Sequence, residues 1–386
     1  MTAAAVAVAI LAAAVSWTVL ALVRDDPMTR PAPRLAPAAA VLPATPATLR
    51  KVFASANGGE TVELAAGRYG TFRGGKKRSL VTLRPRTRGS VSMALHFNPA
   101  VNVRVEGMIL RSVEIAGRSR RVEVANSRFT GPALIRAERM VNAGIVFDGN
   151  RHRNIDVCDG CFEGRLHVTG EAGAPSGITI RRSVFGPGGN ADGIQTGGNG
   201  VRIIQNDFVG IQASEGVHTD AIQLYGSRGT VIRGNWIRDT ASGIVAPDGA
   251  DHEIIENNLI DPGSYPFAIS LGSDDRSVIR HNTLPGGACA FGLRCGIVSL
   301  GGKPEGPRGR GTVVRDNVLS EVSVTNGARV ADNRDNLVAG DRVRPRFAGR
   351  ARPDSWDGFR LASDSPGKSA ASDGADPGIE ARSAGS

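Results

Sequence analysis

The chain has 386 residues, of which 50 are glycine and 41% are hydrophobic, while only 5% are aromatic. Hydrophobic residues recur along the sequence, which excludes an intrinsically disordered protein, and the many glycines and β-branched residues are unlike a helical bundle. With 47 Lys and Arg against 37 Asp and Glu, the formal net charge is +10. This balance favours a polyanionic partner, although charge alone does not choose between nucleic acid, anionic lipid and acidic polysaccharide.

The first predicted element is a targeting segment over residues 1–26. Residues 3–23 carry no charge, and a membrane-spanning helix needs about 20 such residues. A cleaved secretory signal peptide is the alternative. Both interpretations predict a protein that is secreted or anchored at the cell envelope, with this segment as its only contact with a membrane. A Pro/Ala-rich linker is expected over residues 27–48.

From residue 49 onward the dominant feature is an internal repeat of 22 to 29 residues. Five segments share an Asn followed two positions later by a hydrophobic residue, and these segments are 201–208, 230–237, 253–260, 277–284 and 312–319. Between them lies a second column, a small residue followed by Ile or its equivalent, at Gly193, Ala221, Gly243, Ala268 and Gly296. The steps of this column are 28, 22, 25 and 28 residues. Two such columns indicate a solenoid, because each repeat is too short to bury its own hydrophobic face.

Stacking of the coils, about 4.8 Å apart, would align equivalent side chains. One column is then expected to form a ladder of hydrogen-bonded amides at a turn, and it consists of Asn206, Asn235, Asn258, Asn282 and Asn317. Beside it runs a column that alternates in charge over its first three members, Arg233, Glu256, Arg280 and Arg315. We interpret this second column as structural ion pairs.

These coils resemble right-handed parallel β-helix proteins of the pectate lyase superfamily. The segment 49–72, LRKVFASANGGETVELAAGRYGTF, is similar to the opening coil of that family, and the segment 357–382 is similar to its closing segment. The resemblance implies an all-β fold, a single right-handed parallel β-helix of roughly ten or more coils over residues 49–340. A closing segment and tail would occupy residues 341–386. The resemblance does not determine the activity, because the superfamily contains polysaccharide lyases, epimerases, hydrolases and non-catalytic proteins.

Four cysteines form two close pairs, Cys158 with Cys161 and Cys289 with Cys295. In an exported protein each pair is expected to form a local disulfide, although four cysteines allow three connectivities. The Cys-Asp-Gly-Cys spacing would also suit a redox dithiol or half of a zinc site. The sequence shows neither the βαβ setting that a redox dithiol needs nor the second ligand pair that a zinc site needs.

Two consecutive coils carry the most polar residues before a predicted strand, Asn-Ala-Asp-Gly-Ile-Gln at 190–195 and His-Thr-Asp-Ala-Ile-Gln at 218–223. Alignment of the two segments stacks three pairs of side chains, which are Asn190 with His218, Asp192 with Asp220, and Gln195 with Gln223. Two carboxylates one coil apart repel each other and raise one pKa, as acid/base chemistry requires. We place both Asp residues in the turn before the strand.

Three interpretations of these coils stay open. In the first, His218 removes the proton beside a uronate carboxylate in β-elimination or epimerisation, and Tyr225 or Tyr265 exchanges a proton. In the second, Asp192 and Asp220 are the acid and base of a glycoside hydrolase. In the third, the polar residues are turn caps or Ca²⁺ ligands of a non-catalytic β-helix that binds glycan or serves as an envelope scaffold.

The second interpretation is weakened by a departure from a known pattern. The segment around Asp192 resembles part of the polygalacturonase pattern, but the adjacent Asp-Asp of that family is Thr219-Asp220 here. The Gly-His-Gly and Arg-x-Lys elements of that family are absent from the sequence. Lyase or epimerase chemistry is therefore preferred over hydrolysis.

The sequence thus predicts a monomer that acts on an acidic, uronate-containing polysaccharide. Its expected substrate-binding residues are Asn190, Gln195, Gln223, Tyr225 and Tyr265. The sequence pattern requires no cofactor. The cofactor that it would best accommodate is Ca²⁺, with Asp248, Asp274 and Asp275 as candidate ligands. Nucleic acid is excluded as a partner because the basic residues are scattered without interleaved aromatic residues.

Overall fold

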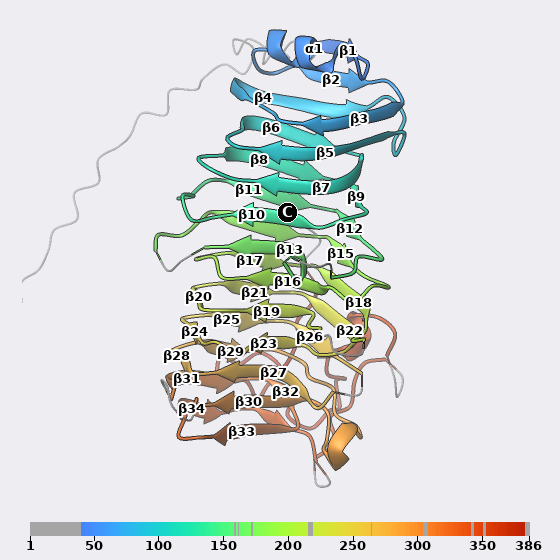
Figure 1. Ribbon diagram of the computed structural model, residues 1–386. Helices are drawn as coiled ribbons and strands as arrows, with labels where there is room; N and C mark the ends of the chain where they lie inside the picture. Colours follow the sequence, from blue (N-terminus) through green and yellow to red (C-terminus); the bar gives the residue numbers. More distant parts are fainter. Residues whose placement is uncertain are drawn as a thin grey trace, which may run out of the picture. The chain divides into compact units, whose positions relative to one another are not determined.

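The computed structural model shows a stack of β-strand coils that begins at residue 41 (Figure 1). It describes residues 40–157, 160, 162–170, 173–214, 219–263, 265–303, 308–340, 343–349 and 353–382. The predicted targeting segment and the first part of the predicted linker lie outside these residues. Within the described ranges, no helix is both long and apolar enough to cross a membrane.

One parallel sheet forms a continuous wall along the stack. Its strands are β1 (Val41–Ala44), β2 (Thr61–Leu64), β4 (Lys76–Pro85), β6 (Val101–Glu106), β8 (Arg120–Ala125), β11 (Ile145–Asp148), β14 (Ile178–Arg181), β17 (Arg202–Ile204), β21 (Val231–Arg233), β25 (Ile254–Glu256), β29 (Val278–Arg280), β31 (Arg310–Arg315) and β34 (Arg329–Arg334), with β20 (Ser227–Arg228), β24 (Ala250–Asp251) and β28 (Asp274–Asp275) at one side. We call this wall the first sheet.

The second sheet starts with three strands, β3 (Gly67–Phe72), β5 (Val91–Phe97) and β7 (Ile109–Ile115), and then divides into two ladders. The short ladder consists of β9 (Arg128–Phe129), β12 (Arg151–His152), β15 (Val184–Phe185), β18 (Asp207–Ile211), β22 (Trp236–Thr240) and β26 (Leu259–Asp261). The long ladder consists of β10 (Ala133–Arg136), β13 (Gly164–Thr169), β16 (Asp192–Thr196), β19 (Ile222–Leu224), β23 (Ile244–Ala246), β27 (Phe267–Gly272), β30 (Ile297–Gly301) and β33 (Glu321–Thr325). Strands β32 (Val318–Leu319) and β35 (Leu337–Val338) form a separate pair. The predicted all-β solenoid is confirmed.

The solenoid begins earlier than predicted. Strand β1 pairs in parallel with β2, with Val41 opposite Thr61, so the predicted linker was wrong over its last residues. Pro43 is compatible with this strand because β1 lies at the edge of the sheet, where a missing N–H leaves no ladder bond unmade. Helix α1 (Leu49–Ser55) follows and lies over the end of the stack (Figure 1).

The interior is built from aligned hydrophobic residues. The column predicted from the small-Ile pattern lies fully buried in the long ladder, where Ile194, Ile222, Ile244 and Ile269 face one another on successive coils. A second interior column stacks aromatic rings, with His152 held between Phe129 and Phe185 at centroid distances of 4.0 and 4.6 Å. Burial lowers the pKa of His152 to about 3, so this imidazole packs as a neutral ring.

The predicted amide ladder is confirmed at the turn that follows the first sheet. The Nδ2 group of Asn235 donates to Oδ1 of Asn258 at 3.0 Å, and Nδ2 of Asn258 donates to Oδ1 of Asn282 at 3.0 Å. The same Oδ1 atom of Asn258 also accepts the backbone N–H of Asn235 at 3.0 Å. All three residues are fully buried, and the ladder ends at half-buried Asn336. Each amide therefore satisfies backbone and side-chain groups of the coil before it.

The charged column is confirmed as ion pairs over its first three members, whereas Arg315 pairs with its neighbour Asp316 at 3.6 Å. Glu256 accepts hydrogen bonds from Arg233 on one side and from Arg280 on the other, the latter at 2.7 Å. These hydrogen bonds hold the pKa of the Glu256 carboxyl below its usual value despite partial burial.

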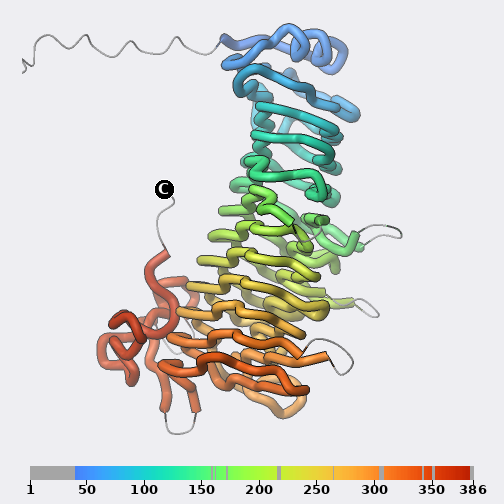
Figure 2. Tube along the Cα trace, turned by 90° about the vertical axis from the view of Figure 1, so that its left-hand side faces the viewer, coloured from blue at the N-terminus to red at the C-terminus, as the bar shows by residue number. Residues whose placement is uncertain are grey.

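The C-terminal segment turns back and lies beside the coils (Figure 2). The indole Nε1 of Trp356 donates to the carbonyl of Glu380 at 2.8 Å, and the N–H of Glu380 donates to Oδ1 of Asn257 at 2.8 Å. Arg382 forms an ion pair with Asp207 at 2.8 Å. The segment thus bonds to coils that precede it by up to 176 residues.

The amide ladder makes a testable prediction for stability. Asn258→Ala leaves a backbone N–H of Asn235 and the carbonyl of Ile232 without their partners, and each buried unsatisfied group costs about 1–3 kcal/mol. We expect the free energy of unfolding, measured by urea denaturation, to fall by roughly 2–5 kcal/mol. Asn336→Ala, at the half-buried end of the ladder, should have a clearly smaller effect because water can replace the amide. Equal losses in the two variants would contradict the argument.

Candidate functional site

One row of side chains runs along the outward face of the second sheet. Its members from β5 to β19 face one another on successive coils, and they are His96, Glu114, Leu134, His167, Gln195 and Gln223. They point outward because the residues beside them in the strands, such as Leu166 and Ile194, are fully buried. From β23 onward the row continues as Val245, Ser270, Ser299 and Ser323. The imidazole, carboxyl and amide side chains of the row therefore end at Gln223.

His167 and Tyr225 form a hydrogen-bonded pair in this row. The Tyr225 hydroxyl lies 2.7 Å from Nε2 of His167, and Nδ1 of His167 lies 2.6 Å from Oε1 of Gln195. Nε2 of Gln195 donates to Oε1 of Gln223 at 2.5 Å and to Glu163 at 3.3 Å. Because the amide of Gln195 is fixed by these bonds, its oxygen accepts the Nδ1–H of His167. The lone pair of Nε2 is then left to accept the Tyr225 hydroxyl.

Gly197 allows Tyr225 to reach His167. Tyr225 follows β19 and His167 lies in β13, so the ring of Tyr225 must cross the coil of β16 that lies between them. It crosses at Gly197, where an added Cβ would lie 2.8 Å from Cε2 of the Tyr225 ring. A residue with a side chain at this position would displace the ring.

Burial sets the protonation of the pair. It lowers the pKa of the His167 imidazole to about 4, with the Arg136 charge acting in the same direction. It also raises the pKa of the Tyr225 phenol to about 12. The ring of Phe162 stacks on His167 with centroids 4.0 Å apart, and His167 is only 3% exposed. At neutral pH the pair is therefore a neutral imidazole that accepts a hydrogen bond from a protonated phenol.

A cavity of about 480 Å³ opens beside His167 and extends over the preceding coils. His167 and Phe162 line one end, while Arg73, Glu114 and Arg136 line the remainder. Glu114 forms an ion pair with Nε of Arg136 at 2.8 Å, and its other carboxyl oxygen lies 3.0 Å from Nδ1 of His96. The hydrogen bond from Arg136 holds the pKa of the Glu114 carboxyl below its usual value. We call this space the groove cavity.

The structure buries the two predicted catalytic carboxyls. Asp192 and Asp220 are 1% and 0% exposed. Oδ1 of Asp192 accepts the backbone N–H of Asp220 at 2.7 Å, and Asp220 in turn accepts the hydroxyl of Ser242. The prediction of an acid/base pair in the turn before the strand is corrected: Asp192 is the first residue of β16, and both carboxyls are buried, with one oxygen of each accepting a hydrogen bond from the next coil.

The predicted interaction between the two carboxyls is nevertheless present. The pKa of Asp192 is raised to about 8, first by burial and then by the negative charge of Asp220. Arg165 lowers it in part; this fully buried guanidinium donates to the carbonyls of Gly188, Gly189 and Ala191. With this raised pKa, the buried Asp192 carboxyl is protonated at neutral pH.

The other predicted site residues have different surroundings. Gln195 and Gln223 lie in the outward row as described above. Asn190 fixes loops, since its Oδ1 accepts the N–H of Val157 at 3.0 Å and its Nδ2 donates to Ser214 at 2.8 Å. Tyr265 packs edge-on against Phe267. His218, the predicted base, lies outside the described residues, as do Cys158 and Cys161, whereas the predicted disulfide between Cys289 and Cys295 is formed.

The three candidate Ca²⁺ ligands bind other groups. Asp248 pairs with Lys303 at 3.1 Å, Asp274 accepts the hydroxyls of Ser277 and Thr312, and Asp275 accepts the N–H of Arg310 at 2.9 Å. Across the part of the chain that the structure describes, three or more His, Cys, Asp or Glu side chains nowhere gather in a metal-binding arrangement. These three Asp residues are explained as turn and ion-pair residues.

The sequence contained a signal for His167 that the predictions did not use. Leu166 lies opposite Ile194, and Ile194 lies opposite Ile222. Both steps are 28 residues. Continuing the hydrophobic column one coil toward the N-terminus would therefore have placed His167 next to Gln195.

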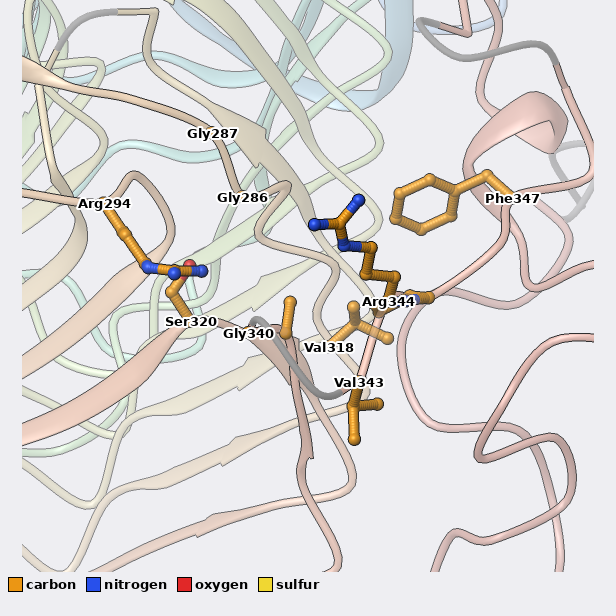
Figure 3. Close-up of a pocket in the computed structure, with 11 residues that line it drawn as sticks. Gly286, Gly287, Arg294, Val318, Ser320, Gly340, Val343, Arg344 and Phe347 are labelled. Atoms are coloured by element: carbon orange, nitrogen blue, oxygen red, sulfur yellow. The ribbon is translucent and has the colours of Figure 1, made fainter.

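A separate cavity of about 310 Å³ lies between the last coils and the closing segment (Figure 3). Arg294 and Arg344 are its charged lining residues, and Val318, Val343 and Phe347 supply apolar surface. None of the predicted site residues lines it.

Comparison with known proteins supports the fold. Residues 111–284 match the family model of the right-handed β-helix region. No curated protein matches the chain. The predicted resemblance to right-handed parallel β-helix proteins is therefore confirmed at the level of the fold.

Several solved structures are similar. The A-module of mannuronan C-5 epimerase AlgE4 from Azotobacter vinelandii is 13% identical, with 76% of this chain and 94% of that chain covered and a TM-score of 0.42. The PL6 family polysaccharide lyase Pedsa3628 from Pseudopedobacter saltans is 13% identical, with coverage of 88% and 100% and a TM-score of 0.44. PfbA, a surface adhesin of Streptococcus pneumoniae, is 13% identical, with coverage of 72% and 83% and a TM-score of 0.44. Such distant similarity carries no argument about activity.

The raised pKa of Asp192 predicts a specific pH dependence. The folded protein keeps this proton up to about pH 8, whereas an unfolded chain releases it near pH 4. The free energy of unfolding therefore falls as pH rises through this window. Asp192→Asn keeps an oxygen for the N–H of Asp220 and has no proton to lose. Its stability relative to the unaltered protein should increase between about pH 5 and pH 8 in urea denaturation.

Asp248→Asn, which changes an exposed carboxyl, is the matched control and should show no such trend. A difference between Asp192→Asn and the unaltered protein that stays constant over this pH range would show that Asp192 is ionised in the fold.

Proposed function

We propose that the chain is an exported protein that acts on a uronate-containing polysaccharide by β-elimination or epimerisation, with His167 and Tyr225 as the acid/base pair. One observation carries the proposal: a tyrosine hydroxyl is bonded to the lone pair of a neutral imidazole at the end of a cavity lined by arginine side chains. Other supports are the positive net charge of +10 and the outward position of the row, which faces a polymer lying along the coils.

Both reactions begin with removal of the proton on the carbon beside the uronate carboxylate. Tyr225 would take that proton while its own hydroxyl proton passes to Nε2 of His167. The Nδ1–H of His167, held by Gln195, stabilises the imidazolium that forms. A cation such as Arg136 would pair with the substrate carboxylate and stabilise the negative charge that develops on it.

The two outcomes differ in the fate of the electron pair. In β-elimination the electron pair forms a carbon–carbon double bond and the glycosidic C–O bond breaks. The departing oxygen then takes a proton from the Tyr225–His167 pair. In epimerisation the electron pair takes a proton from a water molecule on the opposite face of the same carbon, His167 returns the proton that it received to the resulting hydroxide through solvent, and no bond of the chain is broken. The bound carboxylate would also raise the low pKa of His167, since a nearby negative charge favours the imidazolium.

Hydrolysis has less support, because the carboxyls that it would require are inside the wall. Binding of glycan without turnover is the second candidate. It is favoured by one observation, the small exposure of His167 beneath the ring of Phe162.

Tyr225→Phe tests the proposal on the full-length chain. The unaltered protein, incubated with a panel of polyuronates, should produce either the ultraviolet absorbance of unsaturated uronate or a changed uronate configuration by NMR. Loss of the phenol hydroxyl should lower the rate by about 10²–10⁴-fold, the usual contribution of an acid/base group. Tyr69→Phe is the matched control, because its hydroxyl binds backbone carbonyls of Ala44 and Ala65 and lies outside the row.

Activity that survives Tyr225→Phe would remove the pair from the mechanism. Binding of a polyuronate without any turnover would instead establish the second candidate.

A further inference from the structure

The first coils carry a cavity of about 730 Å³ beside helix α1 that is rich in cations. Arg50, Arg73, Lys76 and Lys77 line it, and its lining includes no acidic residue. Lys77 is committed to the fold, because its ammonium group donates to the carbonyl of Ala56 at 2.6 Å. The other three cations are exposed, and none of them forms an ion pair with another residue that the structure describes.

A second cavity of about 630 Å³ adjoins the first, since Lys76 lines both. Its charged lining residues are Lys76, Arg118, Arg120 and Arg139, again without an acidic residue. All four are exposed. Arg118 and Arg139 lie on turns that lead into the first sheet, and Lys76 and Arg120 are the first residues of β4 and β8 in that sheet. We call the exposed cations of the two cavities the basic turn surface.

The basic turn surface is continuous with the proposed active site. Thr71 and Arg73 line both the first cavity and the groove cavity that ends at His167. Successive coils are about 4.8 Å apart, so the cations are distributed along a line that runs from the acid/base pair toward α1. Like charges held so close together without counter-ions produce a positive potential that attracts a polyanion.

We propose that the basic turn surface is a second, non-catalytic binding site, which holds carboxylates of an acidic polysaccharide at a distance from the bond or carbon that reacts. The identity of this polymer rests on the proposed function. Continuity with the groove cavity favours a polysaccharide over a membrane. Nucleic acid is disfavoured because two of the three aromatic lining residues, Phe53 and Phe72, are buried. The third, Tyr69, is half-buried, so the cavity lacks a set of exposed rings for base stacking.

The consequence for the substrate is a dependence on chain length. A short oligosaccharide would occupy the groove cavity alone, whereas a longer one would also contact Lys76 and Arg118. The distant contacts are made equally before and during the reaction, so they strengthen binding of long chains.

The test compares two triple variants of the full-length protein that lose the same charge. Arg50→Ala, Lys76→Ala and Arg118→Ala together remove cations of the basic turn surface and leave the groove cavity intact. Arg84→Ala, Arg202→Ala and Arg329→Ala remove exposed arginines from strands of the first sheet. The affinities for polygalacturonate and alginate, and for trimers of each, are measured by calorimetry at low and high salt.

The first triple variant should bind the polymers about tenfold more weakly than the second, as expected for three exposed ion pairs. The difference should shrink at high salt, and the trimers should bind both variants equally. Equal polymer affinities for the two variants would overturn the proposal. So would a first variant that keeps its polymer affinity and loses binding to phosphatidylserine vesicles, because the surface would then belong to a membrane.

The result is independent of catalysis. Weaker polymer binding by the first variant, without turnover of any polyuronate by the unaltered protein, would retain the binding site and remove the proposed activity. Turnover that depends on Tyr225, together with equal polymer affinities of the two triple variants, would retain the proposed activity and remove the second binding site.

Discussion

The hydrogen bonds between stacked asparagine amides fix the alignment of the coils on which every other feature depends. In a parallel β-helix the backbone hydrogen bonds set the spacing between coils, but the hydrophobic interior specifies their register along the strand only weakly, because it tolerates sliding of similar residues. The amides remove this freedom. Oδ1 of Asn258 accepts both a backbone and a side-chain N–H of Asn235, and a shift of one residue would leave these buried groups without partners.

Once the alignment is fixed, alternate side chains of a strand point into the interior, where they stabilise the fold, or outward, where they are available for chemistry. In β16, Ile194 fills the interior while its neighbour Gln195 faces outward and bonds to His167. The outward residues on neighbouring coils are then brought together without any loop having to position them. The same stacking has the opposite effect at the start of the strands, where the carboxyls of Asp192 and Asp220 are drawn into the wall by the N–H and hydroxyl groups of the next coil. Position relative to the strand therefore decides whether a polar residue has a structural or a chemical role.

The fold was predictable from the sequence because its determinants repeat. The amide column and the Ile column each recur on at least five coils, so the solenoid, the ladder around Asn258 and the ion pairs of Glu256 could all be derived from spacing. The site was only partly predictable. Gln195 and Gln223 were found because they follow the repeating Ile, whereas the coil of His167 lacks the Asn and Gly residues that mark the later coils.

Two errors had physical causes that composition does not show. Strand β1 contains Pro43, which is typical of a linker, but an edge strand tolerates a proline. The two Asp residues have the spacing of an acid/base pair, but spacing along the chain does not show that one oxygen of each carboxyl will find a donor on the next coil.

Because Tyr225 crosses over Gly197 to reach His167, the site depends on the order of the coils along the chain. His167, Gly197 and Tyr225 belong to three consecutive coils, so the acid/base pair does not exist in any single repeat or in any two neighbouring repeats. An inserted or deleted coil between β13 and β19 could leave a stable solenoid, since each repeat contacts only its neighbours. It would separate the phenol from the imidazole. Gain or loss of a repeat, which solenoids otherwise permit, is therefore incompatible with the acid/base pair in this stretch of the chain.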